Sequence, residues 1–143
     1  MKRVWIDHSC TLGADLDTVS ALLRDVDSWP DITPGLEAIV RDVSEPPAVG
    51  GGFRMRLDMK GVPRMTLPAQ IFQWDRERIE WGGGVGGSLI RHSMELSEAG
   101  PASCTLRHVE YATGVLALLW WPLEHVAYRH DRGWSDALEA HFR

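Results

Sequence analysis

The chain has 143 residues, 24% of them charged, and a formal net charge of −5. A chain of this length can bury a core without metals or disulfides, so we expect a single domain over residues 1–143. The acidic balance argues against a nucleic-acid surface, which would need a basic stripe.

The first predicted strand covers residues 4–12, where apolar and polar residues alternate. One face of this strand carries Val4, Ile6, His8, Cys10 and Leu12. Trp5 falls on the opposite face. Asp15 then caps a short amphipathic helix that we expect to end near Asp25. The two prolines within residues 25–35 permit at most one further helical turn.

Six more short strands follow along the chain. We expect them at residues 36–44, 53–60, 65–74, 79–81, 88–97 and 103–113. The second of these has the cleanest period of two, with an inward face and a solvent face. The inward residues are Phe53, Met55, Leu57 and Met59, and the outward residues are Arg54, Arg56, Asp58 and Lys60. Strands joined by tight turns predict an antiparallel meander, and we expect an α+β fold in which this sheet curves around a helix.

A long C-terminal helix is predicted from Gly114 onward. Its expected apolar stripe contains Leu119, Leu123, Val126, His130, Trp134, Ala137 and His141. Pro122 should kink or restart the helix. The apolar run 115–123 is too short to span a bilayer, so we expect no membrane span.

Cysteine content and the N-terminal residues bear on localisation. The chain has only two cysteines, Cys10 and Cys104, and its first basic residues are followed by no apolar run. These features favour a cytoplasmic protein with free thiols.

Several segments resemble one superfamily. They are ALLRDVDSWPDITPG at 21–35, Ile79-x-Trp81, His92-x-Met94-x-Leu96, and Leu106-x-His108-x-Glu110 followed by Gly114-Val-Leu. Together they resemble the SRPBCC superfamily, and within it the polyketide cyclase/dehydrase-like group with the START-type helix-grip fold. The resemblance implies a curved seven-stranded antiparallel sheet around the C-terminal helix, two short helices after the first strand, and a hydrophobic cavity. Members include aromatase/cyclases, lipid carriers and hormone receptors, so the fold alone does not fix the activity.

Candidate catalytic residues lie on the apolar faces of the last strands. His92, His108 and Glu110 share the parity of Met94 and Leu106 and should point into the cavity. Enolisation, aldol closure or dehydration of a poly-β-ketone needs a base and an acid within hydrogen-bond reach. We take His108 with Glu110 as the first candidate pair and His92 as a third catalytic residue. Alternatively, the histidines are ordinary core residues and Glu110 pairs with an arginine or a helix residue.

The walls of the cavity supply the candidate substrate-binding residues. We expect them to be His8, Phe53, Met55, Leu57, Trp81, Met94, Val126, His130 and Trp134. If Leu12 lies beside Cys104 on neighbouring strands, the register places His8 opposite His108. The glycine- and proline-rich segments 45–52, 60–64 and 82–87 should form mobile rims of the cavity.

Other sites are not indicated. Residues 82–87, GGGVGG, precede a strand-like pattern, whereas a dinucleotide site needs a helix there. No tight pair of histidines presents two imidazoles on one element, so we expect no metal and no cofactor. A zinc site formed by His8, His92, His108 and Glu110 stays a second possibility.

Two functions therefore remain open. One is a biosynthetic cyclase or dehydratase that acts on a hydrophobic carbonyl compound, and the other is a non-catalytic carrier or sensor of a lipid-like ligand. Both need a cavity for a hydrophobic small molecule, and both allow a monomer or a homodimer.

Overall fold

The structure is a computed structural model that describes residues 1–42, 45–119 and 121–143. Its elements, in chain order, are β1 Lys2–Leu12, α1 Leu16–Arg24, the 3-10 turn η1 Val26–Ser28, α2 Trp29–Ile32, β2 Leu36–Val40, β3 Gly52–Leu57, β4 Met65–Trp74, β5 Arg78–Val85, β6 Ser88–Gly100, β7 Ser103–Thr113, α3 Val115–Leu119 and α4 Trp121–His141. The α+β order confirms the expected sequence of elements.

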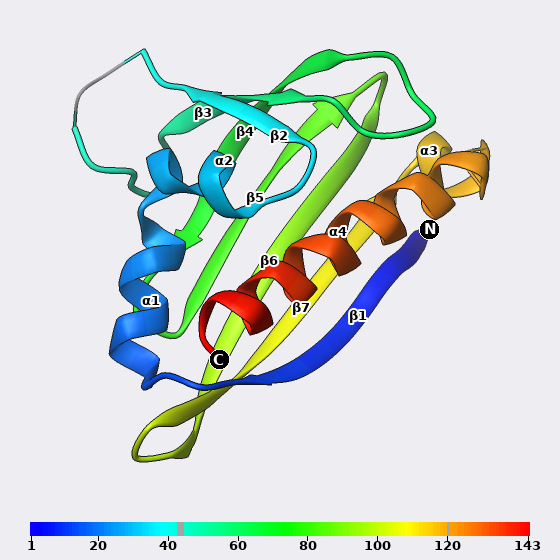
Figure 1. Ribbon diagram of the computed structural model, residues 1–143. Helices are drawn as coiled ribbons and strands as arrows, with labels where there is room; N and C mark the ends of the chain where they lie inside the picture. The colour runs from blue at the N-terminus through cyan, green and yellow to red at the C-terminus, as the bar shows by residue number, and fades with distance from the viewer. Residues whose placement is uncertain (43–44, 120) are drawn as a thin grey trace.

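All seven strands form one antiparallel sheet in the order β1-β7-β6-β5-β4-β3-β2. The sheet curves around α4, while α1 and α2 close one end of the groove between them (Figure 1). The first and last strands pair in the predicted register, with Leu12 opposite Cys104 and His8 opposite His108. This pairing places His108 of β7 beside His8 of β1.

The beginning of β1 departs from the predicted alternation. The β1–β7 register shifts between Val4 and Ile6, so Trp5 is buried and Val4 is exposed. A β-bulge adds one residue and thereby reverses the facing of the residues before it. The expectation that Val4 points inward and Trp5 outward is therefore wrong, and Trp5 becomes part of the interior.

The alternation in and after β3 is confirmed. Phe53, Met55 and Leu57 are buried and Met59 is half-buried, whereas the intervening charged residues are exposed. The strand itself ends at Leu57, three residues earlier than predicted.

The lengths of β2 and β5 differ from expectation. β5 extends to Val85 instead of ending at Trp81, so most of the glycine-rich stretch is strand and only Gly86 and Gly87 form the turn to β6. A Cβ on Gly82 would stand 2.0 Å from the carbonyl oxygen of Ile90, which explains why glycine is required at that position. β2 ends at Val40. The rest of the strand predicted at 36–44 includes residues 43 and 44, which lie outside the described residues.

The helices before β2 begin as expected. The side chain of Asp15 accepts a hydrogen bond from the Thr18 amide at 2.8 Å and caps α1. Residues 26–32 form η1 and α2, two short turns in place of the single turn predicted. The indole of Trp29 donates to the carbonyl of Leu23 at 2.9 Å, which fixes this ring beneath α1.

The C-terminal helix is interrupted near the expected position. α3 ends at Leu119 and α4 begins at Trp121, one residue before Pro122, and residue 120 is outside the described residues. Gly114, with a φ of +73°, makes the turn from β7 into α3.

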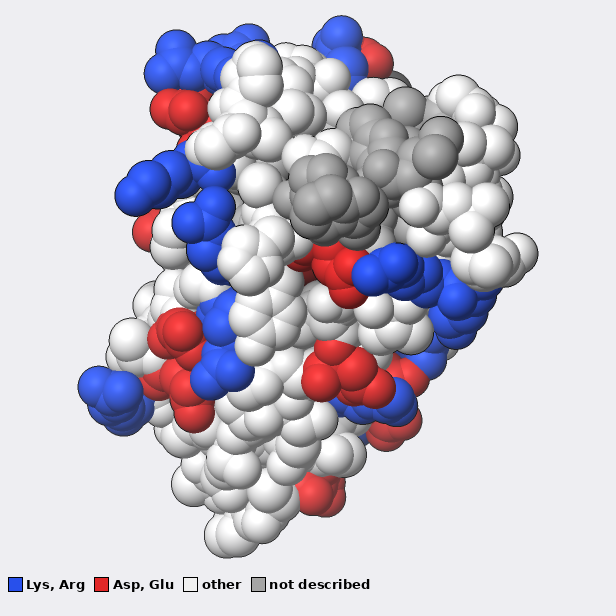
Figure 2. Space-filling view, turned by 90° about the vertical axis from the view of Figure 1, so that its right-hand side faces the viewer, with Lys and Arg blue, Asp and Glu red and all other residues white. Residues whose placement is uncertain are grey.

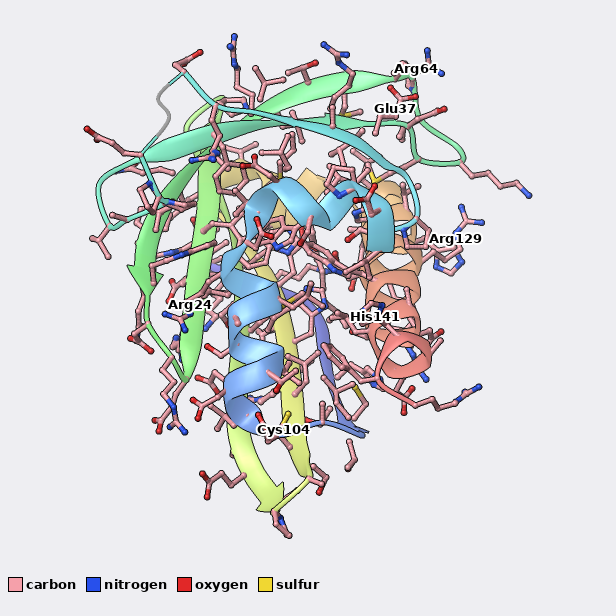
Figure 3. All side chains as sticks on the ribbon, turned by 60° about the vertical axis from the view of Figure 1, so that its left-hand side comes forward. Arg24, Glu37, Arg64, Cys104, Arg129 and His141 are labelled. Carbon is pink, nitrogen blue, oxygen red and sulfur yellow. The ribbon has the colours of Figure 1, made fainter. Side chains whose placement is uncertain are left out.

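The buried face of α4 is displaced from the predicted stripe. Its most buried residues are Asp131, Trp134, Ser135 and Leu138. His141, labelled near the end of α4 in Figure 3, is exposed, so its place on the stripe was predicted wrongly. The displacement turns Asp131 toward the sheet.

The surface is charged and mixed in sign. On the face shown in Figure 2, acidic and basic side chains are interspersed. Within the described part of the chain, no helix combines the length and apolar character that crossing a membrane requires.

Candidate functional site

An apolar cavity of about 140 Å³ lies between the sheet and the first half of α4. The predicted lining residues found in its wall are Met55, Leu57, Trp81, Val126 and His130. Further lining residues include Trp5, Met59, Val62, Met65, Leu67, Ile90, Leu123 and Ala127. The wall is mostly aliphatic and rich in methionine, whose flexible side chain adapts to ligands of varied shape.

Three residues expected to line the cavity are part of the solid core instead. Phe53, Met94 and Trp134 are buried but do not reach the cavity wall. Trp29 packs against two of these residues, with its ring centroid 5.6 Å from that of Phe53 and 5.0 Å from that of Trp134. The short helix α2 thus fills the space that these residues would otherwise border.

The polar end of the cavity is built on two neighbouring strands. His92 on β6 lies directly opposite Glu110 on β7, and its Nε2 is 3.1 Å from Glu110 Oε1. The imidazole stacks on Trp81, its partner on β5, with ring centroids 5.0 Å apart and planes inclined by 6°. Both His92 and Glu110 line the cavity. Stacking and hydrogen bonding therefore hold this pair in one orientation.

His108, the first candidate partner of Glu110, lies behind the cavity wall. It is fully buried, and its Nδ1 is 3.2 Å from Ser135 Oγ on α4. His8, opposite it on β1, is half-buried and also does not line the cavity. The structure thus brings His92, rather than His108, into contact with Glu110.

Asp131 completes the cluster and was not predicted. It is fully buried on α4 and lines the cavity. One of its oxygens, Oδ1, is 3.9 Å from His92 Nδ1 and 4.0 Å from His108 Nε2. The only sequence signal is its spacing: Asp131 lies four residues after Ala127 and three before Trp134, on a row of small and apolar residues.

Burial and proximity divide the protons among these groups. Burial, followed by the adjacent Glu110, raises the pKa of Asp131 well above its usual range. Burial also opposes ionisation of Glu110, but the adjacent His92 lowers its pKa to about 2. Neither carboxylate oxygen of Asp131 has a hydrogen-bond partner among the described residues.

The imidazoles of His108 and His130 are neutral at neutral pH. Burial, with His92 nearby, lowers the pKa of His108 to about 3. Burial likewise lowers the pKa of His130 to about 4. A neutral imidazole keeps one nitrogen lone pair available as a base or a ligand.

The arginines considered as partners of Glu110 are engaged elsewhere. Arg91 pairs with Glu80 at 2.8 Å, and Arg107 pairs with Asp7 at 2.7 Å. Among the described residues, Glu110 therefore has no arginine partner. Its ion pair is with His92.

The loop between β3 and β4 contributes to the cavity wall and contacts α4. Val62 lines the cavity, and the backbone oxygen of Lys60 accepts a hydrogen bond from Arg129 on α4 at 3.5 Å. Arg64 pairs with Glu37 at 3.0 Å, and Figure 3 shows these two side chains together. Val62 of the expected rim 60–64 and Gly82 and Gly83 of the expected rim 82–87 line the cavity, whereas none of the described residues 45–52 does.

Comparisons with known proteins place this fold. No family model and no curated protein matches the sequence. Among solved structures, the Zhui aromatase/cyclase from Streptomyces sp. R1128 has a TM-score of 0.77 at 20% identity and covers 99% of this chain and 93% of its own. The major latex-like protein 151 from Panax ginseng has a TM-score of 0.76 at 14% identity, covering 99% and 97%. A START superfamily protein from Mycobacterium smegmatis has a TM-score of 0.76 at 14% identity, covering 96% and 95%.

These identities are low, so the likeness concerns the backbone. The shared features are the seven-stranded antiparallel sheet, the short helices after β1 and the long helix that the sheet surrounds. The chain therefore has the helix-grip fold of START/SRPBCC proteins, as the resemblance in its sequence implies.

Proposed function

We propose that the protein binds a hydrophobic, carbonyl-containing small molecule in its cavity and catalyses cyclisation or dehydration by acid–base chemistry. The observation that carries this proposal is the hydrogen-bonded pair His92–Glu110 at one end of an otherwise apolar cavity. An aromatase/cyclase among the structures of similar fold supports the same direction.

The cavity dimensions indicate what enters it. An engineered protein cavity of about 150 Å³ accommodates benzene, so about 140 Å³ suits a single ring. A larger ligand requires the loop of residues 58–64 to move away from α4, and Arg129 is its hydrogen-bonded contact with that helix. The apolar walls exclude water, and the polar end orients the oxygen of the ligand.

The proposed chemistry uses the two cavity-facing members of the pair. Glu110 takes an acidic proton from the carbon next to the ligand carbonyl, and the Nε2–H of His92 donates a hydrogen bond that holds Glu110 in position. The resulting enolate attacks a second carbonyl carbon, and the proton returns to the oxygen that becomes a hydroxyl. In the dehydration step, Glu110 takes a second α-proton and passes it to the departing hydroxyl, which leaves as water while the carbon–carbon double bond forms. Positioned groups of this kind accelerate proton transfer by about 10²- to 10⁴-fold.

A direct test follows the first proton transfer. Acetophenone has one ring and slowly exchanging methyl protons, so its deuterium uptake in D₂O reports enolisation inside the cavity. We expect wild-type protein to accelerate this exchange and Glu110→Gln to lower the acceleration by about 10²-fold or more, with acetophenone still bound. His125→Gln, on the exposed part of α4, is the matched control and should leave exchange unchanged.

The carrier function is the second candidate, and the depth of the cluster favours it. Asp131 and Glu110 are buried and line the cavity, as expected for groups that only anchor a ligand. Equal exchange rates in wild type and Glu110→Gln, with acetophenone bound by both, would replace the cyclase proposal by the carrier. Native mass spectrometry of protein from its own host should then show a hydrophobic ligand that is released unchanged.

A further inference from the structure

The polar cluster contains four buried ligand-type atoms without a hydrogen-bond partner. They are His92 Nδ1, His108 Nε2 and the two carboxylate oxygens of Asp131. One atom from each residue lies within 4.8 Å of the others, although the residues come from β6, β7 and α4. Buried polar atoms are nearly always paired, so three side chains that turn unpaired atoms toward one point need an explanation.

The opposite edge of each imidazole is already occupied. His92 uses Nε2 to contact Glu110, and His108 uses Nδ1 to contact Ser135. With each of these nitrogens as the N–H donor, the other nitrogen of each ring carries a lone pair directed toward Asp131. Metal-binding histidines are held in this manner, by a carboxylate or another acceptor that fixes the tautomer.

The charges of the cluster also favour a cation. Glu110 and Asp131 are both buried, and among the described residues their ion pairs are with histidines alone, with no lysine or arginine. Buried carboxylates are usually paired with a positive charge or coordinate a metal. A divalent ion would balance both carboxylates while both imidazoles stay neutral.

We infer that His92, His108 and Asp131 form a binding site for a divalent transition-metal ion, with zinc as the ion of choice. Two imidazoles and one carboxylate are a zinc ligand set that leaves a fourth position open. Because His92 and Asp131 line the cavity, a water molecule or a ligand oxygen there can take that position. The site goes beyond the proposed acid–base function, since a bound ion would polarise a carbonyl directly.

The distances allow such a site after a small contraction. Zinc bonds of about 2.0–2.2 Å in tetrahedral geometry bring ligand atoms roughly 3.3 Å apart. The present separations of Asp131 Oδ1 from the two nitrogens are 3.9 and 4.0 Å. The two histidine nitrogens lie within 4.8 Å of one another, so the largest contraction needed is about 1.5 Å, shared by side chains on three elements.

The test measures zinc binding by calorimetry with chelator-treated protein. We expect wild type to bind one zinc ion and to melt at a higher temperature when zinc is present. Asp131→Asn preserves the shape of the side chain, removes the negative ligand and should weaken zinc binding by at least 100-fold. Glu110→Gln, which alters only the group that holds His92, should weaken it by about 10- to 100-fold.

His130→Gln is the matched control, because His130 is adjacent to Asp131, lines the same cavity and is outside the three ligands. It should keep wild-type zinc affinity. Cobalt(II) supplies a second readout, since a four-coordinate site gives an intense visible absorption that Asp131→Asn should lack. Circular dichroism of each metal-free variant establishes that it is folded.

Equal zinc affinity of wild type and Asp131→Asn would overturn the site, and so would an equal loss in His130→Gln. The acetophenone exchange is measured in chelator-treated protein. A failure of zinc binding therefore leaves the proposed acid–base function standing, and a failure of exchange leaves the metal site standing.

Discussion

The interface between the sheet and α4 has two halves that bury their apolar surface differently. In the packed half, beside α1 and α2, Trp29 packs against both Trp81 and Trp134, which also lie next to each other with ring centroids 5.7 Å apart. In the hollow half, along the beginning of α4, Met55 from β3 and Val126 from α4 both line a cavity. The short helix α2 therefore limits the cavity at one end, because it inserts the large ring of Trp29 between the sheet and α4 there.

The polar cluster lies where the two halves meet. His92 stacks on Trp81, which belongs to both the packed core and the cavity wall. Its neighbour His108 contacts Trp134 edge-on, with ring centroids 5.7 Å apart. The packed half therefore supplies rigid support for groups that the hollow half makes accessible, which is the arrangement that a functional site requires.

The largest expected effect concerns the packed half. Trp29→Ala removes a buried ring and its hydrogen bond to Leu23, and it should lower the free energy of unfolding by about 3–5 kcal/mol. Met59→Ala, in the hollow half, removes a half-buried side chain and should cost less than about 2 kcal/mol. Urea unfolding of both variants measures the contrast, and equal losses would show that the two halves do not differ.

The sheet behind the cavity should tolerate no side chain at Gly82. Its added Cβ would meet the backbone of Ile90, so Gly82→Ala should lower the free energy of unfolding by about 1–3 kcal/mol. Gly84→Ala is the control on the same strand, because its nearest contact is an ordinary 3.6 Å. A Gly82→Ala protein as stable as the control would contradict the close strand packing.

Filling the hollow half should block ligand binding. Val126→Phe extends a ring into the cavity and should lower acetophenone affinity at least 10-fold, about 1.4 kcal/mol, without unfolding the protein. His125→Phe, one residue away and exposed, should leave affinity unchanged. Nuclear magnetic resonance titration measures both, and unchanged binding in Val126→Phe would move the ligand to another place.

The smallest expected effect is a stabilisation of α4. A Cβ on Gly133 would meet nothing within 4 Å, so Gly133→Ala should raise the free energy of unfolding by about 0.5–1 kcal/mol. Gly114→Ala should do the reverse, because Gly114 has a positive φ and approaches Gly87 closely. Thermal melting of the two variants should shift in opposite directions.

Much of the fold could be predicted because alternation along a strand is a local property. The pairing of His8 with His108 followed from one register assumption, and the facing of β3 followed from its period of two. The β-bulge near Trp5 could not be predicted, since it arises from how β1 meets β7. The predicted facing of the residues in β1 and β3 was therefore correct except before the β-bulge.

The site was predicted in part for a similar reason. Strand parity correctly brought His92, His108 and Glu110 to one face, but it does not tell which of them reaches the cavity. Asp131 was missed because an aspartate on a helix is ordinarily assigned to the solvent side. Its burial depends on neighbours from two strands, His92 and His108, and such a tertiary effect has no local pattern.

We expect a ligand to occupy the hollow half and to direct its oxygen toward the polar cluster. A crystal structure of chelator-treated protein soaked with acetophenone tests this claim most directly. We expect the ring between Met55 and Val126 and the carbonyl oxygen within hydrogen-bond distance of His92, Glu110 or Asp131. An acetophenone molecule bound outside the cavity, or bound inside it with its oxygen directed away from all three residues, would contradict the account.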